Sequence, residues 1–154
     1  RTWPVMGMYM PDTIDAIEIG GKTWVLTANE GDSRDYDGYS EETRVGKLTL
    51  DPVAFPNAAT LQKDENLGRL KTTTAQGGTD GDGDFDVIYS YGARSFSVLN
   101  ANSDMVFDSG DKFEQFMAAN YERVFNASNT ENYSRDNRSD DKGPEPEGLA
   151  TGYV

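Results

Sequence analysis

The sequence contains no cysteine and no histidine among its 154 residues. Their absence excludes disulfide bonds, thiol nucleophiles, imidazole bases and most zinc or copper sites. Oxygen donors remain, and these suit calcium or magnesium. No apolar run approaches the ~20 residues that a membrane-spanning helix needs, so we expect no membrane span here. Lack of cysteine does not argue against secretion.

Positive charge is scarce as well. Fourteen Lys and Arg stand against 27 Asp and Glu, which gives a formal net charge of −13. A surface this acidic repels phosphate backbones and anionic lipids, so nucleic acid is not an expected partner. Divalent cations are the partners that such a field attracts. The alternative is that the acidity only keeps the protein soluble.

Turn-forming and strand-forming residues are plentiful, with 16 Gly and many aromatic side chains. Residues 13–19 alternate apolar and polar side chains, Gly20-Gly21 supplies a two-residue turn, and residues 22–28 are rich in strand formers. These features predict a β-hairpin. Short strands are also expected at 44–50, 68–74, 85–91, 95–100 and 105–108, and a β pattern restarts at 148–154.

One helix is predicted over 111–125, where apolar side chains recur at helical spacing and Asp111 can cap the first turn. The fold class is therefore all-β with one helix, and short strands with frequent turns favour a sandwich, barrel or propeller. The abrupt start at Arg1-Thr-Trp-Pro, without a signal-peptide pattern, and the β pattern that stops at Val154 lead us to interpret residues 1–154 as a fragment of a larger domain.

An acidic loop, Thr79-Asp-Gly-Asp-Gly-Asp-Phe-Asp, places four carboxylates at alternate positions. Glycines between them let the backbone curl around an ion, and clustered carboxylates repel one another unless a cation lies among them. The residue twelfth from the first Asp is Tyr91 rather than Glu, which argues against an EF-hand. We predict a single-loop calcium site whose role is structural, with a solvated turn as the alternative. Its ligands would be Asp80, Asp82, Asp84 and Asp86.

Two further polar segments could form a second site. The loop at 29–38 follows a strand directly, and its acidic side chains could bind a cation while its arginine binds a carboxylate or phosphate. Two prolines stiffen the segment at 139–148 and hold two glutamates on one side of it. An internally paired loop and a plain extended linker are the alternatives. The candidate residues are Glu30, Asp32, Arg34, Asp35, Glu145 and Glu147.

Three Asn-X-Ser sequons lie within the polar segment 126–142, at Asn126, Asn132 and Asn137. We expect this segment to be an exposed loop. Clustered sequons in such a loop are glycosylation candidates if the protein passes through a eukaryotic secretory pathway.

Seven segments, in order along nearly the whole chain, resemble the choice-of-anchor I family. They include Thr27-Ala-Asn-Glu-Gly-Asp-Ser-Arg-Asp-Tyr, Tyr91-Gly-Ala-Arg-Ser-Phe-Ser and Ser139-Asp-Asp-Lys-Gly-Pro-Glu-Pro-Glu-Gly, besides the acidic loop. The others begin at Tyr9, Leu67 and Val106. The family includes proteins similar to a mesenchyme-specific cell surface glycoprotein associated with biomineralisation.

The resemblance implies a secreted or surface-anchored β-propeller longer than this chain, which would then hold a few blades of antiparallel strands. Together with the acidic charge and the Asp-Gly loop, it predicts an extracellular or cell-surface calcium-binding protein with a structural, matrix or biomineralisation role. Its partners would be divalent cations and either the rest of its own propeller or other extracellular chains. The alternative is a calcium-dependent phosphate-ester hydrolase, similar to alkaline phosphatase or phytase, with Arg34 or Arg94 gripping phosphate near Glu30, Asp32, Glu145 and Glu147. We favour the non-enzymatic reading, because acid–base work would fall to carboxylates alone, and we assign no catalytic residue.

Overall fold

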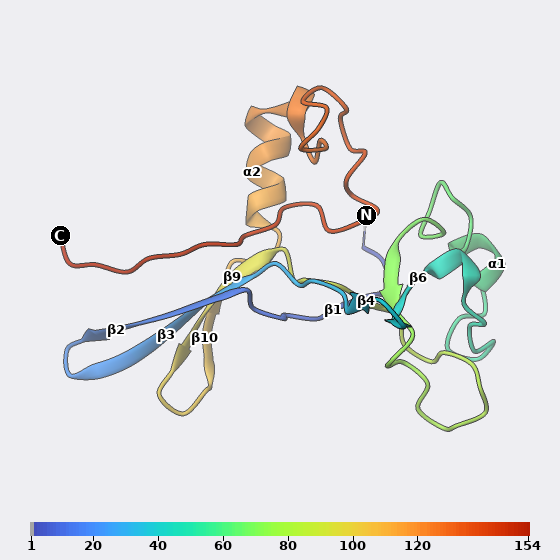
Figure 1. The fold of residues 1–154 in the computed structure, drawn as a ribbon, viewed down its shortest axis with the longest axis horizontal. Coiled ribbons are helices and arrows are strands. Elements are labelled where there is room, and N and C mark those ends of the chain that lie inside the picture. The colour runs from blue at the N-terminus through green and yellow to red at the C-terminus, as the bar shows by residue number, and fades with distance from the viewer. Residues whose placement is uncertain (1) are drawn as a thin grey trace.

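The computed structural model describes residues 2–154 and is all-β with few helices and with sheets that do not close on themselves (Figure 1). One lobe is a four-stranded antiparallel sheet in the order β10-β9-β3-β2. Its strands follow chain order, so residues 30–94 form an insertion between two hairpins. The strands are β2 (Thr13–Ile19), β3 (Lys22–Asn29), β9 (Ser95–Asn100) and β10 (Met105–Asp108).

The insertion, together with the N-terminal strand β1, builds a second lobe around a mixed sheet in the order β1-β8-β7-β6. It also contains a small hairpin of β4 (Asp35–Tyr36) and β5 (Tyr39–Ser40), a 3-10 turn η1 (Val45–Lys47) and a single helical turn α1 (Ala58–Leu61). The hydrophobic core lies in this lobe, where Val45 and Ile88 are fully buried among leucines and Phe55. The sheet strands are β1 (Met6–Gly7), β6 (Glu42–Arg44), β7 (Lys71–Thr73) and β8 (Tyr89–Ser90).

Helix α2 (Lys112–Asn120) follows β10 and stands away from the four-stranded sheet, with the 3-10 turn η2 (Glu122–Val124) at its far end (Figure 1). Its Phe113 ring contacts Phe96 of β9 at a centroid distance of 6.0 Å. The chain then loops back, and its last residues run beside β2, where the Thr151 N–H donates to Asp15 Oδ2 at 2.9 Å. Within residues 2–154, no helix has the length and apolar character needed to cross a membrane.

The predicted hairpin of β2 and β3 is confirmed. The strands pair antiparallel from Thr13 with Ala28 to Ile19 with Lys22. The turn glycines, Gly20 and Gly21, have φ of 62° and 72°, and such a pair of left-handed residues matches the twist of the strands it joins. The strands predicted at 95–100 and 105–108 are confirmed with the same bounds.

Other predicted elements are shorter or different. Residues 45–47 form η1 where a strand was expected, and the predicted strands at 68–74 and 85–91 shrink to β7 and β8. These segments pack as turns around the core, so tertiary burial overrides their strand propensity. The predicted strand at 148–154 is extended but forms no ladder in the described chain.

The predicted helix ends at Asn120 rather than 125. Asp111 precedes its first turn but accepts a hydrogen bond from Gln115 Nε2 (2.9 Å) instead of capping the backbone. The apolar side chains whose spacing predicted the helix remain largely exposed, since Phe113 and Phe116 are both exposed. Phe113 meets Phe96 of β9, and Glu114 pairs with Arg94 at 2.8 Å, so the first turn of α2 is fixed to the rest of the chain.

The four-stranded sheet exposes apolar side chains on both faces. Register places Ile14 and Met105 on one face and Ile19 and Phe107 on the other, and all four are exposed. The side chains of β10 change face because its pairing with β9 shifts between Met105 and Phe107. An antiparallel sheet that packs on one side only has a polar outer face, so this sheet has the composition of one that is covered on both sides.

Candidate functional site

The acidic loop curls as its glycines require. Gly81 and Gly83 have φ of 83° and 99°, a conformation that L side chains rarely adopt. Between them the Asp82 N–H donates to Asp80 Oδ1 (3.3 Å), and the Asp84 N–H donates to Asp82 Oδ1 (3.2 Å). The first two aspartates therefore stabilise the turn of the loop, and both remain exposed.

The last two aspartates of the loop converge with a residue that the sequence did not place there, Asp51. A parallel bridge joins Leu50 to Phe85, and the Asp51 N–H donates to the Phe85 carbonyl at 3.1 Å. One carboxylate oxygen from each of Asp51, Asp84 and Asp86 then lies within 4.8 Å of the other two. The three carboxylates come from two segments, and all are partly buried.

This acidic cluster (Asp51, Asp84 and Asp86) is electrostatically unbalanced. Asp84 Oδ1 is buried and accepts no hydrogen bond within the described part of the chain. Desolvation, helped by the charges of Asp82 and Asp51, raises the pKa of Asp84 to about 6. In contrast, the backbone N–H and hydroxyl of Thr79, at 2.7 and 2.8 Å, lower the pKa of Asp86. A buried, unbonded carboxylate oxygen among like charges fits a hard divalent cation such as calcium or magnesium.

The segments at 29–38 and 139–148 also meet, around a lysine of the same chain. Lys142 Nζ lies 2.6 Å from Glu30 Oε1, 2.6 Å from Asp32 Oδ1 and 3.7 Å from Glu145 Oε2. The lysine side chain is only 12% exposed. Glu145 Oε1 also accepts a hydrogen bond from Arg138 Nε at 2.8 Å. Three of the predicted second-site carboxylates are thus brought together, and an ammonium group lies where a metal ion would.

The other predicted members of the second site lie elsewhere. Asp35 in β4 and Glu147 are exposed, outside the ion pairs of the described chain. Arg34 makes a two-pronged contact with Glu41, with Nε at 3.2 Å and Nη2 at 2.7 Å. Hydrogen bonds from Arg34, against the opposing effect of desolvation, lower the pKa of the buried Glu41 to about 2. The Arg34 guanidinium is therefore already paired with the carboxylate of Glu41 in the same chain.

Arg94, the other arginine considered for gripping phosphate, is also internally bonded. Its Nη1 lies 2.8 Å from Glu114 Oε1, and its Nη2 donates to the Ser139 carbonyl at 2.9 Å. A phosphate-ester hydrolase would need these guanidinium groups to face substrate beside an open metal position. Instead, both arginines hold parts of the fold together.

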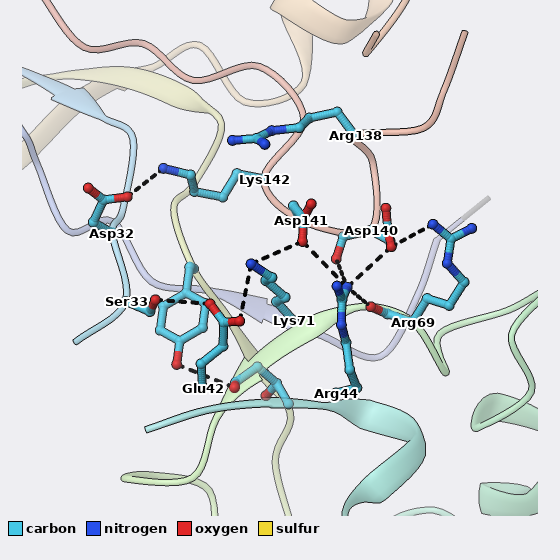
Figure 2. A network of polar contacts seen from close by, with 12 residues as sticks. Asp32, Ser33, Glu42, Arg44, Arg69, Lys71, Arg138, Asp140, Asp141 and Lys142 are labelled. Atoms are coloured by element: carbon cyan, nitrogen blue, oxygen red, sulfur yellow. Dashed lines mark hydrogen bonds and ion pairs between the residues drawn. The ribbon is translucent and has the colours of Figure 1, made fainter. Parts of the chain in front are cut away.

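Figure 2 shows how the 139–142 segment is fixed to the mixed sheet. Asp140 accepts from Arg44 (3.2 Å) and Arg69 (2.8 Å), and the Lys71 ammonium bridges Glu42 and Asp141 at 3.1 and 3.3 Å. The Lys71 backbone N–H adds a bond to the Asp140 carbonyl at 2.9 Å. Together these contacts make the 139–142 segment a strap across the ends of β6 and β7.

Two glycines interlock the loops that follow β3 and β8. A Cβ on Gly31 would lie 2.0 Å from the Gly92 nitrogen, and a Cβ on Gly92 would lie 2.0 Å from the Glu30 carbonyl oxygen. Only glycine permits this approach, and it positions Glu30 toward Lys142. The sequence marks both positions, since Gly31 and Gly92 each lie within a segment that resembles the choice-of-anchor I family.

The three sequons differ in structure. Asn126 is buried, and its Nδ2 donates to Glu114 Oε1 (3.0 Å) and Ser139 Oγ (2.8 Å). Asn132 and Asn137 are exposed. Asn126 therefore stabilises the loop that it begins, whereas the other two asparagines have accessible amides.

Comparison with known proteins gives a consistent set of relatives. Gigasin-3a of Magallana gigas is 42% identical over 98 residues, which cover 60% of this chain and 34% of that protein. A mesenchyme-specific cell surface glycoprotein of Strongylocentrotus purpuratus is 26% identical over 178 aligned residues, which cover 94% of this chain and 23% of that protein. The chain thus spans about a third or less of the length of these relatives. No solved structure matches it. The model of the choice-of-anchor I domain matches residues 1–154, and the chain belongs to that family.

Proposed function

We propose that this chain is a calcium-stabilised part of an extracellular or cell-surface protein with a structural role in a matrix, of the biomineralisation type. The name of the sea urchin relative supports the location, since it describes a cell surface glycoprotein. The acidic charge of −13 supports a partnership with divalent cations.

The observation that carries the calcium proposal is the convergence of Asp51, Asp84 and Asp86, with Asp84 Oδ1 buried and without a hydrogen bond in the described chain. Calcium accepts six to eight oxygen ligands in flexible geometry, so three carboxylates can be supplemented by backbone carbonyls and water. The ion would tie the 79–86 loop to the segment after Leu50. Its contribution would be stabilisation of the core lobe.

Thermal unfolding in calcium and in chelator tests this proposal. We expect calcium to raise the melting temperature of the wild-type chain, because a ligand that binds only the folded state stabilises it by about 2.7 kcal/mol at 100 times its Kd. Asp84→Asn should abolish the calcium response. Asp80→Asn is the matched control, since Asp80 lies in the same loop but outside the acidic cluster, and its response should persist. An equal melting temperature in calcium and chelator would refute the proposal.

The four-stranded sheet supports the proposal that this chain is part of a larger β structure. Its strands follow chain order as an antiparallel meander, which is the form of a propeller blade. Both faces expose apolar side chains, such as Ile14 on one and Phe107 on the other. We therefore propose that further sheets, from the rest of a propeller, cover both faces. A cysteine placed at either position should react with a thiol reagent in this chain and be protected in a chain of the relatives' full length.

A further inference from the structure

A cleft of about 810 Å³ lies between the core lobe and the segment that carries α2 and the 136–140 loop. It is separate from the acidic cluster and from Lys142, and nothing in the proposed function uses it. Its size falls within the range of small-molecule sites, which is about 300–1,000 Å³. Its lining combines aromatic, aliphatic and charged side chains.

One wall of the cleft is apolar and fixed. Trp3, Val5 and Leu70 line it, and all three are partly buried and packed against the hydrophobic core. Phe125, which follows η2, contributes a second aromatic ring and is also partly buried. An indole held in place by core packing is a platform that loses little entropy when a ligand stacks on it.

A polar wall, formed by two arginines and their carboxylate partners, makes up another part of the lining, and its cations are already neutralised. Arg94 pairs with Glu114 at 2.8 Å, and Arg69 pairs with Asp140 at 2.8 Å. These pairs hold the guanidinium groups and carboxylates in place, so they offer oriented hydrogen-bond donors and acceptors without demanding a charged ligand. Further carboxylates line the cleft and are exposed, namely Asp64, Glu65, Asp111 and Asp136.

This combination selects the class of ligand. A purely apolar ligand would leave the polar wall desolvated and unpaired, which is unfavourable. An anionic ligand would be repelled by the exposed carboxylates. A sugar ring presents a C–H face that stacks on aromatic rings and hydroxyl groups that both donate and accept. We propose that this cleft binds a short neutral or amino-bearing oligosaccharide.

Tryptophan emission gives a direct test, because the chain has two tryptophans, Trp3 in the cleft and Trp24 in β3. In the Trp24→Phe variant, emission reports on Trp3 alone. Tetramers of N-acetylglucosamine, glucosamine, glucose and mannose would be titrated to about 10 mM, beyond the Kd of a weak millimolar site, with a heparin tetrasaccharide as the acidic comparison. We expect at least one neutral or amino tetramer to shift the Trp3 emission to shorter wavelength in a saturable way, and heparin to have no effect.

A second variant separates specific binding from adsorption. Arg69→Gln removes a donor from the polar wall, while Arg44 still pairs with Asp140 at 3.2 Å and maintains the fold. Its affinity should fall about tenfold or more, the effect of one good hydrogen bond to a charged group. Asp37→Asn, on the exposed turn between β4 and β5, should leave affinity unchanged. Absence of saturable binding by every neutral and amino tetramer, binding of heparin alone, or unchanged affinity in Arg69→Gln would each overturn the proposal.

Discussion

The two carboxylates that share Lys142 provide a matched test of what burial adds to an ion pair. Glu30 and Asp32 lie at the same distance, 2.6 Å, from the lysine nitrogen. Their side chains are 10% and 81% exposed, respectively. Distance alone predicts equal contributions to stability, whereas solvent screening predicts very unequal ones.

The expected magnitudes follow from this difference in exposure. Neutralising one partner of a buried pair leaves the other charge uncompensated and costs about 3–5 kcal/mol. Because Asp32 and Glu145 remain near Lys142 in Glu30→Gln, we expect a smaller loss of about 2 kcal/mol in the free energy of unfolding. Asp32→Asn removes an exposed pair, which is worth at most about 1 kcal/mol and less at high salt.

Urea unfolding at neutral pH measures both variants. With an m-value of about 2 kcal/mol/M, Glu30→Gln should lower the urea midpoint by about 1 M, and Asp32→Asn by less than half as much. Raising the salt concentration should erase the Asp32→Asn effect and leave most of the Glu30→Gln effect. Equal losses in the two variants would refute the assignment of Lys142 as a buried counter-ion of Glu30.

Three further predictions address other parts of the fold. The folded-state pKa of Glu41 is about 2, below its ordinary 4.5, so its ion pair stabilises the fold above pH 4.5 and this stabilisation is lost as the pH falls toward 2. In urea unfolding, Glu41→Gln should therefore reduce the fall in the free energy of unfolding between pH 4.5 and pH 2. Gly31→Ala should lower the free energy of unfolding by more than about 4 kcal/mol or prevent folding, because its Cβ would collide with the Gly92 backbone. The control is Gly38→Ala, which is also left-handed but lies in open space and should lose only about 1–2 kcal/mol. Similar losses in the two variants would contradict the close packing of Gly31 against Gly92. In chain secreted from animal cells, peptide mapping should find glycan on Asn132 but not on the buried Asn126, and a glycan on Asn126 in folded protein would contradict its structural role.

Local patterns predicted the elements whose geometry is set locally. The Gly20-Gly21 turn fixed the hairpin of β2 and β3, because two consecutive left-handed residues leave little choice of turn. The curl of the acidic loop followed from Gly81 and Gly83 for the same reason. Residues 45–47 were misassigned, because burial of Val45 in the core decides their conformation more than strand propensity does.

The candidate sites were predicted only in part, because their membership depends on contacts between distant segments. Asp51 joins Asp84 and Asp86 through a bridge at Leu50 that no local pattern marks. Lys142 reaches Glu30 across 112 residues, so the sequence grouped the carboxylates but not the cation among them. Similarly, the apolar spacing at 111–125 predicted α2 but not which of its side chains are buried, because burial depends on contacts that helix periodicity does not specify.

Calcium binding by the acidic cluster is tested most directly by a crystal structure of this chain grown in calcium, with the ion located by its anomalous signal. We expect one ion bound by oxygens of Asp51, Asp84 and Asp86 at about 2.3–2.6 Å, with Lys142 still between Glu30 and Asp32. An ion bound by Asp80 and Asp82 alone, or a fully ordered acidic loop without any ion at saturating calcium, would contradict it.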